Sequence, residues 1–120
     1  MTVYNMNFTV TKEDTAKEIG SGSLPVLATP RVVAMAEHTC MLSLDEELEN
    51  GETTVGAFID IKHLRPTRIG ARVKVSCELV QTDGKLFEFV YDVYEQDMLV
   101  ASGAHKRVKV DSEKFMSQLQ

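Results

Sequence analysis

Three polar side chains stand in otherwise apolar stretches of this sequence: an alcohol at Thr29, a carboxylate at Glu37 and an imidazole at His63. An alcohol can orient or attack a carbonyl, a carboxylate can attack it or activate water, and an imidazole can move a proton at neutral pH. The sequence leaves open whether Thr29 or Glu37 attacks. Together these groups suggest acyl-transfer chemistry, provided that the fold gathers them at one surface. The other elements of the chain must then position them.

Glu37 lies in the middle of an apolar helical pattern. It follows Val33 by four residues and precedes Cys40 by three, so we expect it on the face that these residues share. A carboxylate buried on that face loses solvation and needs a hydrogen-bond partner. The alternative interpretation places Glu37 at the edge of the face, either solvated or paired with an arginine.

Thr29 precedes Pro30, and this pair is typical of the start of a helix. We expect Thr29 to be the N-cap and Pro30 the first helical residue, where no amide hydrogen bond is lost. Such a threonine is an ordinary structural residue. However, a helix N-terminus also offers unpaired amides and a positive dipole end that can polarise a carbonyl.

His63 ends an alternating apolar stripe. Strict alternation predicts that the inward-facing residues of this strand are Val55, Ala57, Ile59, Ile61 and then His63. A lone histidine at such a position is more often a core residue than a catalyst, and the acid at Glu37 changes that balance. The other two histidines form no local pair with metal-ligand spacing, so we predict no metal site. His38 should point away from Glu37, and His105 should lie at a sheet surface or a subunit contact.

The order of elements predicts one α+β domain over residues 1–120. A helix from Thr29 to Leu44 follows a short strand at Met6–Val10, a weakly helical segment and the flexible loop Gly20–Ser23. Long antiparallel strands wrapped around one buried central helix form the layout of the hotdog fold. The predicted strands are Thr54–Leu64, Arg72–Thr82, Lys85–Glu95 and Met98–Val110.

Composition excludes several classes of function. The 120 residues carry a net charge of −5, so nucleic acid and anionic membranes are not expected partners. No apolar run is long enough to span a membrane and no secretory leader is evident, which predicts a cytoplasmic protein. Cys40 and Cys77 lie among apolar neighbours, and we expect both to be reduced core residues.

The spacing of Thr29 and Glu37 and the segment VGAFIDIKHLRPTRIG at Val55–Gly70 resemble the fluoroacetyl-CoA-type thioesterases of the hotdog superfamily. The strand SGAHKRVKV at Ser102–Val110 and the terminal SEKF add to the resemblance, which covers residues 8–115. It implies that Thr29, Glu37 and His63 are catalytic and that Arg107 belongs to the active-site region.

The resemblance also implies hydrolysis of an acyl-CoA thioester by a homodimer, or a tetramer built from dimers, with active sites at the subunit interface. No cofactor is expected, since CoA is part of the substrate. Its phosphates need cations, and Arg65 and Arg68 flank the loop after His63. Further candidates on outward-facing positions are Arg72, Lys74, Lys106 and Arg107.

One feature departs from the family pattern. The segment before Thr29 reads Gly20-Ser21-Gly22-Ser23-Leu24-Pro25 and lacks the aromatic residues that would form an apolar lid, so fluorine-specific recognition is not expected. A short, medium-length or aryl acyl group fits equally well. Two other functions stay open from the sequence: a non-catalytic module that binds an acyl ligand, and a hotdog dehydratase using a histidine and an acid.

Overall fold

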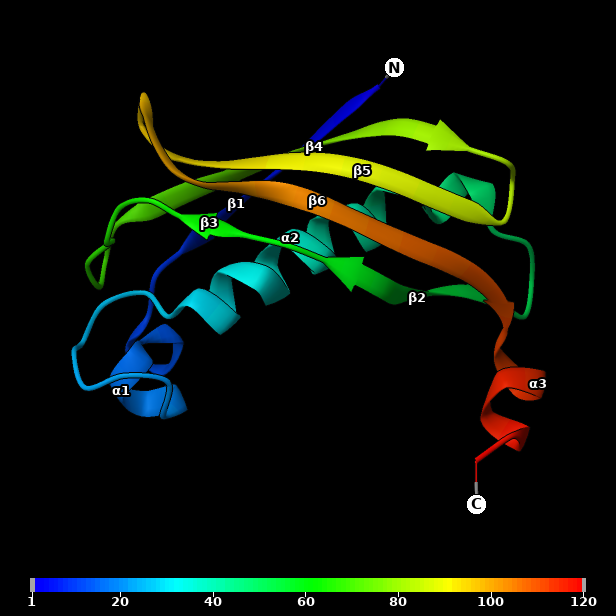
Figure 1. Cartoon of the computed structure of the whole chain (residues 1–120), viewed down its shortest axis with the longest axis horizontal. Helices are drawn as coiled ribbons and strands as arrows, with labels where there is room; N and C mark the ends of the chain where they lie inside the picture. The colour runs from blue at the N-terminus through cyan, green and yellow to red at the C-terminus, as the bar shows by residue number, and fades with distance from the viewer. Residues whose placement is uncertain (1, 120) are drawn as a thin grey trace.

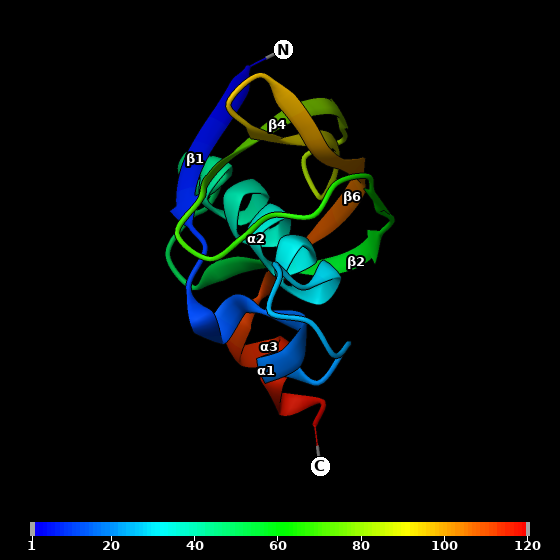
Figure 2. The ribbon, with the colours of Figure 1, turned by 90° about the vertical axis from the view of Figure 1, so that its left-hand side faces the viewer.

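The computed structural model describes residues 2–119, in which an antiparallel sheet curls around the long helix α2 (Thr29–Ser43). Figure 1 shows the sheet covering one side of this helix, and Figure 2 shows α2 end-on inside the curl. The strands are β1 (Val3–Thr9), β2 (Glu52–Ile59), β3 (Lys62–His63), β4 (Arg72–Thr82), β5 (Leu86–Glu95) and β6 (Met98–Asp111). Their order in the sheet is β1-β4-β5-β6-β2, and β3 pairs with β6.

Short helical segments complete the chain. Two of them, a 3-10 turn at Lys12–Asp14 and helix α1 (Ala16–Ile19), form where weak helical character is predicted. A second 3-10 turn at Asp45–Glu47 follows α2, and helix α3 (Ser112–Ser117) follows the last strand. Within the described residues, no helix combines the length and the apolar character that crossing a membrane requires.

The core lies between the concave face of the sheet and α2. On β4 the side chains of Val73, Val75 and Cys77 are buried while Arg72 and Lys74 are exposed, which confirms the predicted alternation. The partner strand β5 buries its own alternate residues against the helix, and each large apolar side chain buried in this way stabilises the fold by about 1.5–3 kcal/mol. The buried residues of β5 are Phe87, Phe89, Tyr91 and Val93.

The start of α2 differs by one residue from the prediction. Ala28, with φ −74° and ψ 141°, is the N-cap, and its carbonyl accepts hydrogen bonds from the backbone of Arg31 and Val32. Thr29 is therefore the first helical residue, and the prediction that it caps the helix is wrong. Its hydroxyl makes no capping bond and is left for another partner.

The predicted strand Thr54–Leu64 is broken into two strands. The pairing of β2 with β6 slips between Gly56 and Phe58, so Ala57 is an inserted bulge residue. One inserted residue reverses which side chains face inward, so Thr54 is buried and Ala57 is exposed. The prediction of strict inward alternation from Val55 to His63 is therefore wrong at Val55 and Ala57, which precede or form the bulge. It is confirmed at Ile59 and Ile61, which pack against the core.

The break between β2 and β3 is fixed at Asp60. Its amide donates to the Ala104 carbonyl at 3.0 Å, and its side-chain Oδ1 accepts the Ala104 amide at 2.7 Å. Its carbonyl accepts a bond from the Tyr91 hydroxyl at 2.7 Å. A side chain at Gly103 would collide with the same carbonyl, so this position requires glycine. The pinned break directs His63 toward the N-terminal end of α2.

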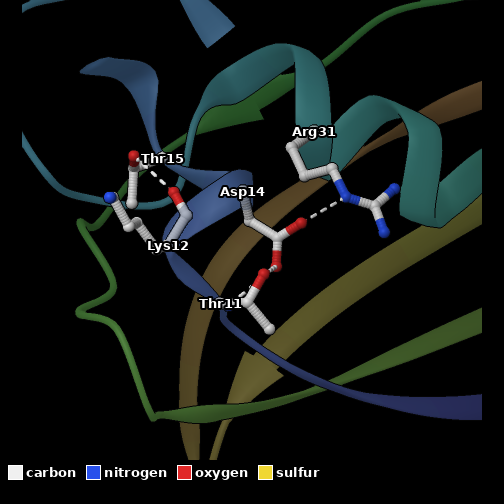
Figure 3. A network of polar contacts seen from close by, with 5 residues as sticks. All are labelled: Thr11, Lys12, Asp14, Thr15 and Arg31. Atoms are coloured by element: carbon white, nitrogen blue, oxygen red, sulfur yellow. Dashed lines mark hydrogen bonds and ion pairs between the residues drawn. The ribbon is translucent and has the colours of Figure 1, made fainter. Parts of the chain in front are cut away.

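A buried carboxylate ties the N-terminal segment to the first turn of α2, as Figure 3 shows. Asp14 is only 7% exposed; its Oδ1 accepts a bond from Arg31 Nε at 2.7 Å, and its Oδ2 accepts one from the Thr11 backbone at 2.8 Å. Its own carbonyl accepts the Ala28 amide at 2.9 Å. Burial acts to raise the pKa of Asp14, but the bonds from Thr11 and Arg31 outweigh it, and the pKa lies below its ordinary value of 3.8.

We predict that Asp14→Asn lowers the free energy of unfolding by about 1–2 kcal/mol at pH 7, because Arg31 loses a charged partner but keeps partial access to water. A carboxylate with a lowered pKa in the folded state stabilises above the unfolded pKa, and this contribution is lost as the pH falls through the folded value. Urea unfolding should therefore show a difference between wild type and variant that is present at pH 7 and shrinks below pH 3.8. A Glu13→Gln variant, altered at an exposed carboxylate of the same turn, should match wild type. Equal stability of wild type and Asp14→Asn at pH 7 would contradict this role.

Candidate active site

Thr29 and His63 meet at the mouth of α2. The Thr29 Oγ1 and His63 Nδ1 atoms are 2.7 Å apart, which is a short hydrogen bond. Thr29 begins the helix and His63 ends β3, whose pairing of His63 with Ala101 on β6 holds the ring at this place. The structure thus brings together two of the three residues that the sequence singles out.

The environment of His63 favours its neutral form. Burial lowers the pKa of His63 from its ordinary value of 6.5, although contact with the Arg65 backbone acts in the opposite direction. The second ring nitrogen, Nε2, is buried and has no hydrogen-bond partner among residues 2–119. When Nε2 carries the ring proton, Nδ1 accepts the Thr29 hydroxyl proton, and the ring is arranged as a general base.

Both residues line an open cavity of about 330 Å³. The Thr29 side chain is exposed there, and Arg65 adds a cation at the rim. The walls come from the β3–β4 loop, from α1 and from the segment before α2, and none of the lining residues in the described part of the chain is Phe, Tyr or Trp. This agrees with the sequence of Gly20–Pro25. The other lining residues are Ala16, Ser21, Val26, Leu27, Ala28, Pro30, Leu64 and Pro66.

Glu37 lies elsewhere on the same helix. It is half-buried, and its Oε2 faces Gly56 so closely that a Cβ added to that glycine would be only 2.7 Å away. Eight residues separate Thr29 from Glu37, which places their Cα atoms about 12 Å apart along the helix axis. Glu37 is not among the residues that line the Thr29–His63 cavity in the described chain. Within one protomer, the candidate residues therefore form two groups.

A buried polar network surrounds the Glu37 group. The Arg107 guanidinium donates to Thr54 Oγ1 at 2.8 Å and to the Thr54 carbonyl at 3.0 Å, and its third bond reaches His105 Nε2 at 3.1 Å. Because arginine can only donate, His105 Nε2 must accept, and Nδ1 then donates to the Phe58 carbonyl at 2.7 Å. The network holds both sides of the β2 bulge.

The negative charge of Glu37 acts on the buried Arg107 and His105 side chains. Burial lowers the pKa of Arg107, and the nearby charge of Glu37 opposes that shift. Burial also lowers the pKa of His105, which favours the neutral ring that this set of bonds requires. The Gly56 backbone is the point where Glu37, His105 and Arg107 come together.

Two predictions are wrong here. His105 is 1% exposed, so of its two predicted places the sheet surface is wrong, and Arg107 is 6% exposed, so the prediction that it faces outward is wrong. Its closeness to Glu37 does agree with the active-site region that the resemblance implies. The sequence does indicate that His105 and Arg107 lie together, because residues two apart on one strand share a face. Gly56 and Thr54 gave no such signal.

The arginines of the β3–β4 loop lie apart from each other. Arg65 and Arg68 are both exposed, but Arg65 lines the Thr29–His63 cavity and Arg68 lines a different one. Both remain candidates for contact with a substrate. Lys106, another predicted cation, forms an ion pair with Glu88 at 3.6 Å.

Known proteins are similar to this chain in sequence and in architecture. The family described as fluoroacetyl-CoA-specific thioesterase matches residues 10–113. A fluoroacetyl-CoA thioesterase from Streptantibioticus cattleyicolor is 29% identical over 94 residues, which are 78% of this chain and 68% of the relative.

Solved structures confirm the hotdog fold. A hot-dog-like protein from Thermanaerovibrio acidaminovorans has a TM-score of 0.89 at 21% identity, covering 98% of this chain and 87% of its own. A variant of the fluoroacetyl-CoA-specific thioesterase FlK, in complex with fluoroacetate and CoA, has a TM-score of 0.90 at 25% identity and covers 95% of this chain and 96% of its own. A thioesterase-superfamily protein from Thermus thermophilus has a TM-score of 0.89 at 25% identity, covering 98% of this chain and 87% of its own.

We predict that Gly56→Ala leaves the fold intact but lowers the turnover of an acyl-CoA thioester by about tenfold or more, because the new methyl group displaces the Glu37 carboxylate. The displaced group is the end of a flexible side chain, so the melting temperature should change little. Gly103→Ala is the matched contrast, since its methyl group would strike backbone and should lower the melting temperature strongly. If Gly56→Ala turned over at the wild-type rate, the close approach of Glu37 to Gly56 would not be needed for the reaction.

Proposed function

The chain belongs to the fluoroacetyl-CoA-specific thioesterase family, and we propose that Thr29, His63 and Glu37 carry out its hydrolysis of an acyl-CoA thioester to a free acid and CoA. Thioesterase activity on CoA thioesters is the property of the family; the residues, their roles and the acyl group are our proposal. The observation that carries it is the 2.7 Å hydrogen bond between Thr29 Oγ1 and His63 Nδ1.

The first half-reaction uses this hydrogen bond. His63 Nδ1 accepts the Thr29 proton as the hydroxyl oxygen attacks the thioester carbonyl. The tetrahedral intermediate collapses, the C–S bond breaks, and the protonated imidazole returns its proton to the CoA thiolate. The products of this half-reaction are free CoA and an acyl ester on Thr29. A neutral imidazole in the resting enzyme is the condition for this step, and burial of His63 supports it.

The second half-reaction needs a base for water, and Glu37 is the proposed group. The carboxylate accepts a proton from water as the oxygen attacks the ester, and this proton then passes to the departing Thr29 oxygen. Glu37 of the same protomer begins about 12 Å along the helix from Thr29. We therefore propose that Glu37 of a second copy of the chain serves each Thr29–His63 pair.

The edge of the sheet supports a homodimer. Strands β2 and β3 pair with β6 on one side only, which leaves their other edge open. Phe58 on this edge is 47% exposed, and Leu64, just after β3, is 55% exposed. An open edge with apolar side chains is a surface that a second chain can cover. An antiparallel copy across this edge would also close the exposed side of Thr29.

The cavity supports a broad choice of acyl group. Apart from Thr29, His63, Ser21 and Arg65 its walls are apolar side chains, and no Phe, Tyr or Trp among the described residues lines it to clamp one substituent. The proposed substrates are therefore short, medium-length or aryl acyl-CoA esters, with no strong preference for fluorine. The proposed steps use side chains alone, so they require no cofactor beyond the CoA of the substrate.

The proposed function is tested by thiol release from a panel of acyl-CoA esters. Thr29→Val and His63→Gln should each reduce kcat by about a hundredfold or more, because one removes the nucleophile and the other removes its base. In wild type, kcat/KM should hold constant from pH 8 down to 6.5 and fall at lower pH, since the pKa of His63 is lowered and protonation disables it. A panel that releases no thiol would favour the non-catalytic binding module, and unchanged kcat in both variants would refute these roles.

A mixture of two inactive variants tests which subunit supplies Glu37. Dimers formed by refolding equal amounts of Thr29→Val and Glu37→Gln should recover about one quarter of the wild-type rate, because half of the dimers contain one intact site assembled from two chains. Each variant refolded alone is the control. If all three groups came from one chain, the mixture would stay as inactive as its components.

A further inference from the structure

A second cavity, of about 470 Å³, lies on the convex face of the sheet and gathers basic side chains. Arg72 and Lys74 of β4 and Arg68 of the β3–β4 loop all line it, and we call these three residues the convex-face cations. The catalytic steps proposed above do not use them. Asn7, Tyr94 and Glu95 contribute to the same cavity.

The backbone explains why these cations converge. Val73 and Val75 of β4 face the core, so Arg72 and Lys74 must project from the opposite face. Pairing places Lys74 directly beside Asn7 of β1 and Tyr94 of β5, so the three form one cross-strand row. Arg68 joins them from a turn in which the Ala71 amide donates to the Arg68 carbonyl at 3.2 Å.

The convex-face cations have no fixed counter-charge. None of them lies within 4 Å of a carboxylate among residues 2–119, although the chain as a whole carries a net charge of −5. Glu95 is the one carboxylate that lines the cavity, against three cations. Lys74 Nζ is 5.9 Å from the centre of the Tyr94 ring, which keeps its charge at the cavity. The site therefore has an excess of positive charge that an anionic ligand can neutralise.

The position of the cavity relates it to the catalytic one. The β3–β4 loop runs between them: Leu64, Arg65 and Pro66 line the catalytic cavity, and Arg68 lines the other. Val26, which lines the catalytic cavity, forms an isolated β-bridge with Arg68. The two linings have no residue in common, but the β3–β4 loop and this bridge join them at one end of the sheet, where the loop lies to the left in Figure 1.

We infer that the convex-face cations bind the phosphates at the nucleotide end of the CoA thioester. This inference rests on the proposed function. In CoA, the pantetheine arm separates the thioester from the phosphates, so a phosphate site must lie away from Thr29 but remain connected to its cavity. Arginine and lysine are the side chains that recognise phosphate oxygens, and the ring of Tyr94 offers a flat surface beside them for the adenine base.

The same phosphate chemistry could come from a free nucleotide rather than from the substrate. The two sources differ in what they compete with. A nucleotide end held as part of the substrate makes adenosine 3′,5′-bisphosphate a competitive inhibitor against acyl-CoA. A separate nucleotide site would let that compound bind without competition.

The test uses full-length Arg72→Gln/Lys74→Gln and two substrates with the same acyl group: the CoA ester, and the N-acetylcysteamine ester, which lacks every phosphate. We expect the KM for the CoA ester to rise by about tenfold or more, with a much smaller change in kcat and a smaller KM difference in 0.5 M salt. The values for the N-acetylcysteamine ester should follow those of wild type. Lys85→Gln/Lys114→Gln, which removes the same charge at another surface, is the control and should not change the KM.

Several outcomes would overturn the inference. An unchanged KM for the CoA ester would do so, as would an equal loss with both esters or non-competitive binding of adenosine 3′,5′-bisphosphate. Failure of the proposed function looks different, since wild type would then hydrolyse neither ester. In that case, calorimetric titration with CoA still decides the site: affinity about tenfold weaker in Arg72→Gln/Lys74→Gln than in wild type supports it, and equal affinity refutes it.

Discussion

The hydrogen bond between Thr29 and His63 depends on two departures from regular structure, and the remaining features of the site follow from it. Thr29 is free to bond His63 only because Ala28, and not Thr29, is the helix N-cap. His63 reaches the helix only because the strand that would have run through it breaks at Asp60. The partly buried ion pair of Asp14 with Arg31 ties the first turn of α2 to the N-terminal segment. If this contact is to serve the proposed chemistry, its surroundings have to hold it in place, because small displacements of reacting groups weaken catalysis steeply.

The second group shows how buried polar residues shape a sheet edge. Arg107 is buried without a carboxylate at ion-pair distance among the described residues, and its cost is offset by three hydrogen bonds and by the nearby charge of Glu37. His105 of the same network donates a hydrogen bond to the Phe58 carbonyl, and this bond fixes the register of the bulge against β6. Removing one member would leave the others unsatisfied, which typically costs about 1–3 kcal/mol for each neutral group. The network therefore sets the position of Gly56, and Gly56 permits the approach of Glu37.

Sequence pattern predicted the regular parts of this fold and not the irregular ones. The exposed and buried faces of β4 follow from alternation alone, since one side of the sheet contacts solvent and the other packs against α2. The bulge at Ala57 could not be predicted, because a single inserted residue leaves composition unchanged and only reverses the faces. The types of the candidate catalytic residues were also evident from the sequence. That His63 joins Thr29 and not Glu37 was not evident, because it depends on the break between β2 and β3 at Asp60.

In the proposed mechanism, Thr29 attacks the thioester and His63 accepts its proton. The most direct measurement is intact-protein and peptide mass spectrometry after a rapid acid quench of Glu37→Gln with an acyl-CoA ester, since this variant should form the acyl-enzyme but hydrolyse it slowly. We expect a mass increase equal to the acyl group, located on the peptide that contains Thr29. This increase should be missing from a Thr29→Val/Glu37→Gln double variant. An acyl group found on Glu37 in the quenched wild-type enzyme, or one that persists without Thr29, would contradict this mechanism.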